Sequence, residues 1–172
     1  MKQIVCFFAL LFSTLGGPLM AQHRSEAVEV KVEKLQATPM GVSVTLRTSD
    51  SRQSVQMMIG FSEGQSIARA MRQEGTSRPM THDLFKIFLD RNGWRVQKVL
   101  IRTLESGTFL ADLTLEHGQE TQVYDARPSD AMAIGLRYGA KIYVNKEVFE
   151  QQKEYQGEPE ELKPSEPETL RL

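Results

Sequence analysis

Two tight turns in the second half of the chain constrain its fold more than any other feature. Ser106-Gly107 and His117-Gly118 separate three segments, at about 94–102, 108–116 and 120–125, in which apolar and polar residues alternate. A period of two is typical of strands with one buried face, and connections this short join antiparallel neighbours. The sequence therefore predicts an antiparallel meander in this half.

Patterns in the rest of the chain extend this meander into an α+β domain. Alternating residues predict three strands between 28 and 59 and a short strand at 141–144. Helical patterns begin with capping residues at Ser62 and Thr81 and with Pro128 at a first helical position, and the fold is expected to contain three to four helices. The second helix is expected to bury its apolar residues between Leu84 and Leu89. The element order favours an α+β fold over a doubly wound parallel sheet.

The N-terminus predicts export. Lys2 precedes an apolar run from Ile4 to Leu15, and Leu19-Met20-Ala21 resembles a cleavage site, so residues 1–21 are expected to be a signal peptide and 22–27 an N-terminal arm. The run is shorter than the roughly 20 apolar residues that span a bilayer, so we expect no transmembrane segment in the mature protein. The expected location is the periplasm or the medium.

Charge separates the domain from its C-terminal tail. Residues 22–146 carry 14 acidic and 17 basic side chains, whereas residues 147–172 carry eight acidic and three basic ones. The mildly basic body tolerates a polyanion but lacks the strong positive charge of a tight nucleic-acid binder. We expect a domain at 28–150 and an acidic, proline-containing, disordered tail at 151–172.

Three charges crowd the junction between a predicted strand and a predicted helix, from Asp125 to Asp130. Pro128 suits the first helical position, which makes Arg127 the N-cap, although arginine caps poorly. Asp130 then meets the free N–H groups of the first turn. An ion pair of Arg127 with Asp125 or Asp130 is one interpretation, and a functional site is the other.

The three helix starts form a candidate site if they converge, because their N–H groups suit an anion such as phosphate. The helix dipole disfavours a charged His82, which leaves a neutral imidazole able to accept a proton or bind a metal. Alternatively, His82 and Asp83 lie in an ordinary exposed turn. Asp125 and Asp130, with His82 or Asp83, have the oxygen-rich character that suits Mg²⁺ or Mn²⁺, although the spacing matches no strong metal motif.

A serine hydrolase is a lesser alternative. Gly60-Phe61-Ser62-Glu63-Gly64 fits the G-x-S-x-G pattern between a predicted strand and a predicted helix. The domain is small for the parallel sheet that such an elbow normally requires, and no HGGG-type motif is present.

Four ordered motifs resemble those of the bifunctional nuclease domain family. They are residues 59–63, 78–84, 107–109 and 125–131, and the resemblance spans about Val28 to Glu150. It implies an α+β fold with a duplicated motif of a strand, a helix and two strands, a barrel-like antiparallel sheet, frequent dimers, and degradation of RNA and DNA. Gly64 and Leu110 stand where alanine and tyrosine are common in the family.

The leading hypothesis is a nuclease that acts on RNA or DNA with a divalent metal. In it, His82 activates water, Arg127 binds the scissile phosphate, and Asp125 and Asp130 hold Mg²⁺ or Mn²⁺. The alternative is a non-catalytic, dimeric module that binds an anionic ligand or a protein. The candidate catalytic residues are His82, Asp83, Arg127 and Glu63, and the candidate phosphate-binding residues are Arg127, Thr81 and Ser129.

Overall fold

The computed structural model describes residues 26–157. The predicted signal peptide at 1–21, most of the predicted arm, and residues 158–172 of the predicted tail lie outside this range. Within it, no helix combines the length and the apolar character that crossing a membrane requires.

One seven-stranded sheet organises the described chain. Its strands are β1 (Ala27–Thr38), β2 (Gly41–Thr48), β3 (Ser54–Ile59), β4 (Arg95–Glu105), β5 (Thr108–His117), β6 (Glu120–Ala126) and β7 (Lys141–Asn145). Their order in the sheet is β3-β2-β1-β7-β4-β5-β6. Two antiparallel meanders, β1–β3 and β4–β6, are joined by β7, which runs antiparallel to β1 and parallel to β4. The predicted second meander is confirmed.

The sheet corrects two expectations, because it is mixed and it is open. A helix connects β6 to β7 and carries the chain back across the sheet, so β7 enters beside β4 in the parallel direction. The order ends at β3 and β6, which do not pair with each other, so the sheet does not close into a barrel. The expected duplication of a strand, helix and two-strand motif is not seen, because two helices follow the first meander whereas one helix and a single strand follow the second.

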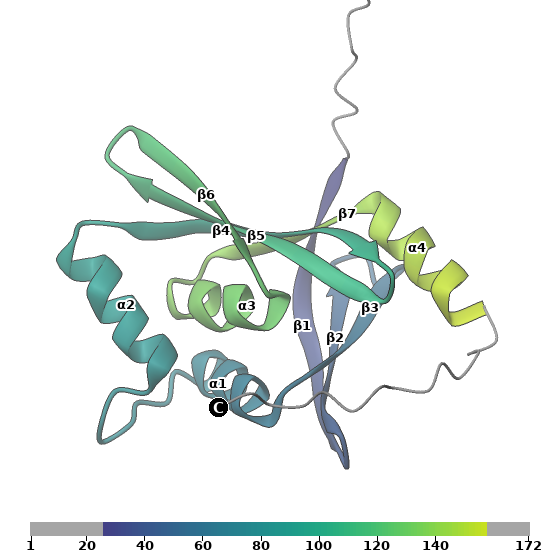
Figure 1. Ribbon diagram of the computed structural model, residues 1–172, viewed down its shortest axis with the longest axis horizontal. Coiled ribbons are helices and arrows are strands. Elements are labelled where there is room, and N and C mark those ends of the chain that lie inside the picture. The colour runs from purple at the N-terminus through teal and green to yellow at the C-terminus, as the bar shows by residue number, and fades with distance from the viewer. Residues whose placement is uncertain (1–25, 158–172) are drawn as a thin grey trace, which may run out of the picture.

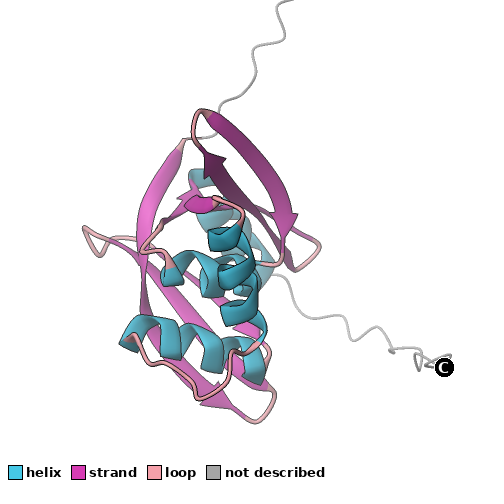
Figure 2. Cartoon of the chain, turned by 90° about the vertical axis from the view of Figure 1, so that its left-hand side faces the viewer, coloured by secondary structure: helices cyan, strands magenta, loops and turns pink. Residues whose placement is uncertain are grey.

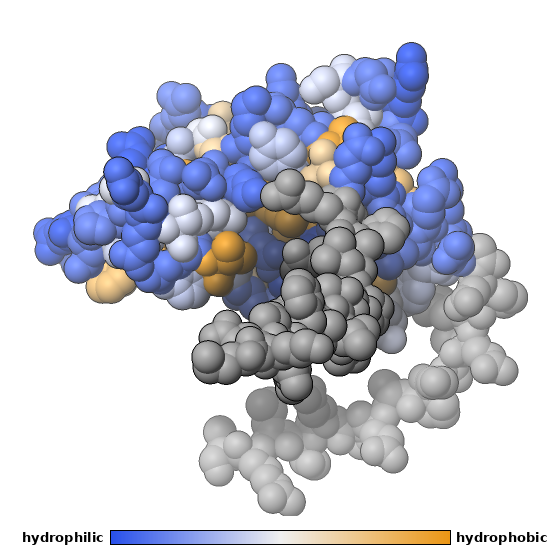
Figure 3. All heavy atoms as spheres, turned by 90° about the horizontal axis from the view of Figure 1, so that it is seen from above, coloured by the Kyte–Doolittle hydropathy of each residue, from blue (hydrophilic) through white to orange (hydrophobic). Residues whose placement is uncertain are grey.

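Four helices complete the described fold, and they confirm the α+β class: α1 (Phe61–Arg72), α2 (Thr81–Arg91), α3 (Pro128–Arg137) and α4 (Lys146–Gly157). The sheet bends sharply between its two meanders, and α1 and α3 lie inside the bend (Figures 1 and 2). The apolar side chains of α3 pack between α1 and strands β4 and β5, which places the core there. Seen from above, the opposite face of the sheet is largely hydrophilic (Figure 3).

The sequence patterns did not locate helix α4, and it continues past residue 150, the predicted end of the domain. The Gln152 side chain accepts a hydrogen bond from the Gln56 N–H at 3.0 Å and donates one to the Gln56 carbonyl. An amide side chain thus replaces a neighbouring strand at the β3 edge, where unpaired backbone groups would otherwise invite another chain. Residues 151–157, which the prediction placed in the C-terminal tail, are part of this helix.

Two predicted caps are wrong, and one is confirmed. Gly60 and Met80 occupy the N-cap positions of α1 and α2, so Ser62 and Thr81 lie inside the helices. Asp83 compensates at α2 by accepting a hydrogen bond from the Met80 N–H at 3.0 Å. At α3, Arg127 is the N-cap with extended backbone and Pro128 follows as the first helical residue, as predicted.

Close packing of α1 on β2 explains the unusual glycine at position 64. A methyl group on Gly64 would lie 2.5 Å from one methyl carbon of Val42, well inside van der Waals contact. Alanine at this position, common in the family, would require Val42 to shift.

The predicted burial of α2 is wrong in part, because Leu89 is buried but Leu84, Phe85 and Phe88 are exposed. The period of 3.6 identifies an apolar face without saying what covers it.

Candidate functional site

A chain of polar contacts joins α1, α2 and the start of α3. Arg127 donates from Nε to Asp130 at 2.7 Å and from Nη2 to Glu63 at 3.0 Å. The other oxygen of Asp130 lies 3.1 Å from Nε2 of His82, and Nδ1 of His82 lies 2.9 Å from the hydroxyl of Ser66. The prediction that the helix starts meet is confirmed for Glu63, His82, Arg127 and Asp130.

The charges in this chain stabilise one another. Burial alone would raise the pKa of Asp130, but hydrogen bonds from Arg127 and His82 outweigh it and hold that pKa below its ordinary value. The Ser62 hydroxyl, more than Arg127, lowers the pKa of Glu63. Asp130, and then Glu63, raise the pKa of Arg127. At neutral pH one cation is therefore held between two carboxylates.

Hydrogen-bond chemistry assigns the His82 tautomer. An ionised Asp130 can only accept, so Nε2 of a neutral His82 carries the hydrogen, and Nδ1 is left to accept the Ser66 hydroxyl proton. Both ring nitrogens are thus engaged. Sequence reasoning missed Ser66, although it lies three residues after Glu63 and therefore on the same face of α1.

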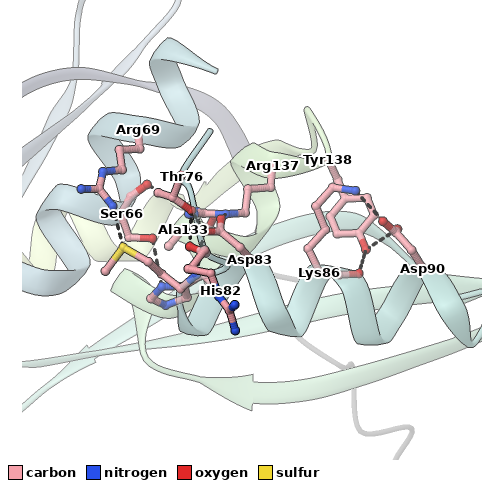
Figure 4. A network of polar contacts seen from close by, with 12 residues as sticks. Ser66, Arg69, Thr76, His82, Asp83, Lys86, Asp90, Ala133, Arg137 and Tyr138 are labelled. Carbon is pink, nitrogen blue, oxygen red and sulfur yellow. Dashed lines mark hydrogen bonds and ion pairs between the residues drawn. The ribbon is translucent and has the colours of Figure 1, made fainter. Parts of the chain in front are cut away.

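Asp83 belongs to a second network that lies beside the first. Its carboxylate accepts a hydrogen bond from Nε of Arg137 at 2.8 Å, and Arg137 also donates to the carbonyls of Ala133 and Ser66 (Figure 4). The Arg137 side chain is only 9% exposed. Burial would raise the pKa of Asp83, but hydrogen bonds from Arg137, the Met80 N–H and Thr76, together with the charge of Arg137, outweigh it and lower the pKa. Asp83 therefore ties α2 to α3.

Asp125 lies apart from these networks. Its carboxylate pairs with Arg102 at 2.8 Å, and Arg102 also binds Asp112. Of the two predicted ion pairs of Arg127, the pair with Asp130 is therefore confirmed and the pair with Asp125 is absent. Asp125 and Asp130 thus bind different side chains, which does not favour them as joint ligands of one ion. Residues 26–157 contain no group of three or more His, Cys, Asp or Glu side chains arranged to hold a metal.

A cavity of about 500 Å³ opens at the N-terminus of α3. Arg127, Pro128 and Ser129 form one side of it, and the remaining lining comes from β3, the β4–β5 turn and α4. Arg127 is 68% exposed at this position. Two of the three predicted phosphate-binding residues, Arg127 and Ser129, therefore share one cavity, whereas Thr81 is not part of its lining.

Comparison with known proteins identifies the family. The family description of the bifunctional nuclease domain matches residues 44–156, and the chain belongs to this family. Two uncharacterized proteins of Mycobacterium tuberculosis, MT1877 and Rv1829, from strains CDC 1551 and H37Rv, are each 36% identical to it over 124 residues. That alignment covers 72% of this chain and 72% of each relative.

The Asp83–Arg137 pair should make stability depend on acid pH. Asp83 has a folded pKa below the unfolded value of 3.8, so its contribution is present above that pH and is lost as the pH falls through the folded pKa. We expect Asp83→Asn to cost about 2 kcal/mol at pH 7, because it leaves a buried guanidinium poorly paired. Urea unfolding from pH 7 to pH 3 should give a smaller acid loss in Asp83→Asn than in wild type.

The matched control is Glu105→Gln, which removes an exposed carboxylate at the end of β4, outside the three helices. Equal stability of Asp83→Asn and wild type at pH 7 would contradict this role.

Proposed function

We propose that this protein is a nuclease that hydrolyses phosphodiester bonds in RNA or DNA. Membership of the bifunctional nuclease domain family carries the proposal. The cavity at the start of α3 supports it, since Arg127 lies there beside Ser129, whose N–H has no hydrogen-bond partner in the described chain.

The phosphate would bind at Arg127. Within the described chain, Nε and Nη2 of Arg127 contact carboxylates, and Nη1 has no partner. Nη1 is therefore available to an anionic oxygen, and the Ser129 N–H lies in the first turn of α3, where the helix dipole favours negative charge. In this proposal, Glu63 and Asp130 orient the guanidinium.

His82 is the proposed proton acceptor for the attacking water. Nδ1 carries the lone pair in the tautomer assigned above, so His82 must release the Ser66 hydroxyl before Nδ1 can accept a proton from water. Dependence on Mg²⁺ or Mn²⁺ also remains part of the proposal, although no reaction step is assigned to a metal. We further propose that the protein is exported to the periplasm or the medium.

A cleavage assay with the protein that comprises residues 22–172 tests the proposal. RNA and single-stranded DNA are the substrates, and Mg²⁺, Mn²⁺ or EDTA is present. Arg127→Ala should reduce the rate about 100-fold or more, since it removes charge stabilisation from the transition state. His82→Gln should also reduce it. Arg52→Ala is the matched control, because Arg52 is exposed and pairs only with Asp50. Absence of turnover, or an unchanged rate in Arg127→Ala, would remove the proposal.

A second candidate function is a dimeric protein-binding module. The observation that favours it is an exposed apolar surface formed by Phe85 and Phe88 of α2 with Tyr124 of β6, which line one cavity. These residues lie next to the open edge of the sheet, where β6 has no outer strand partner in the described chain, whereas α4 covers the β3 edge. Antiparallel pairing of β6 with β6 of a second copy would satisfy that edge.

Light scattering after gel filtration tests this second candidate. A dimer is expected, and Val123→Lys with Tyr124→Glu should convert it to a monomer by placing charges at the edge. Met40→Lys, at an exposed turn residue outside this surface, should leave the dimer intact. A monomeric wild type at micromolar concentration would contradict it.

A further inference from the structure

The cavity at the start of α3 has a polar end and an apolar body. Arg127 and Ser129 form the polar end, and Arg127 is the one charged side chain among the described residues that line it. The apolar body is formed by Met57, Met58, Ile59, Leu104, Phe109 and Tyr155. A ligand that fits this division carries an anion at one end and a large apolar or aromatic group at the other.

Ser129 points independently to a ligand at the polar end. The residue is only 6% exposed, lines the cavity, and has no hydrogen-bond partner for its hydroxyl within the described chain. Its hydroxyl oxygen is not fully buried and opens into the cavity, and a free hydroxyl beside a helix N-terminus and a guanidinium suits an anionic oxygen. The two glutamines of the lining, Gln56 and Gln152, are already hydrogen-bonded within the protein.

The aromatic side of the cavity is set by the β4–β5 turn and α4, which lie side by side (Figure 1). Gly107 has a φ of +79°, and a methyl group there would lie 2.5 Å from the Tyr155 hydroxyl oxygen. The glycine therefore leaves room for the Tyr155 ring at the cavity rim. Phe109 follows two residues later in the lining, so two aromatic rings are available to a planar ligand.

We propose that this cavity binds one unpaired nucleotide, with its phosphate at Arg127 and Ser129 and its base against Phe109 and Tyr155. The volume of about 500 Å³ lies within the range of small-ligand sites. A base inside a duplex is stacked and paired, and it cannot enter such a cavity without leaving the helix. For cleavage, which rests on the proposed nuclease function, the preferred substrate is therefore single-stranded.

Calorimetric titration with AMP and with ribose 5-phosphate tests the two ends separately. AMP should bind more tightly than ribose 5-phosphate, which lacks the base. Arg127→Ala should weaken both ligands. Tyr155→Leu should weaken AMP about tenfold through lost stacking and leave ribose 5-phosphate unchanged.

Phe109→Leu provides a second test of the same wall in case one variant folds poorly. Tyr143→Leu is the matched control, since Tyr143 of β7 lies outside the lining of this cavity and should not affect either ligand.

The outcomes separate this inference from the nuclease proposal. AMP binding that depends on Tyr155 or Phe109, without cleavage of any nucleic acid, supports the nucleotide site and removes the nuclease. Equal affinity for AMP and ribose 5-phosphate, or no AMP binding in a protein that cleaves RNA, overturns the nucleotide site. Binding of AMP that is unaffected in both aromatic variants also overturns it.

Discussion

The Asp130 carboxylate is the interaction on which the site depends. It accepts hydrogen bonds from Arg127 beside it and from His82 on α2, while Glu63 on α1 holds the same guanidinium. Three helices therefore meet at Asp130 and the Arg127 guanidinium that it binds. Because Asp130 is partly buried, this position suits a charge only when its partners are present.

The fold explains why this meeting point lies beside a cavity. Helix α3 connects the end strand β6 to the central strand β7, so its N-terminus starts near the sheet edge and its apolar body crosses the bend. Arg127 is placed at that start by Pro128, which fixes the first helical residue. Ser129 and the Arg127 guanidinium consequently line the same cavity, beside β3, the β4–β5 turn and α4.

Local sequence signals predicted much of this arrangement. The turns at Gly107 and Gly118 both have positive φ, and they set the meander that the alternation predicts. Pro128 and Arg127 predicted the α3 start correctly, and the charges at three helix starts predicted that Glu63, His82 and Asp130 would gather. These features depend on residues close together in the chain.

Long-range packing decided the rest. The parallel entry of β7 beside β4 follows from where α3 packs, which no local pattern records. Asp125 binds Arg102 because the pairing of β4, β5 and β6 brings Asp125 close to β4. Arg127, which is only two residues away in the sequence, binds other carboxylates. Helix α4 was missed because its outward residues are charged, and its role at the β3 edge rests on one glutamine, Gln152.

The central claim is that Arg127 is the anion-binding group of the site. The nitrogen chemical shifts of the arginine side chains test this claim most directly. Titration of labelled protein with AMP should shift the guanidinium resonances of Arg127 and leave those of Arg137, held by Asp83, unchanged. Unchanged Arg127 resonances at saturating AMP, or equal shifts at both arginines, would contradict the account.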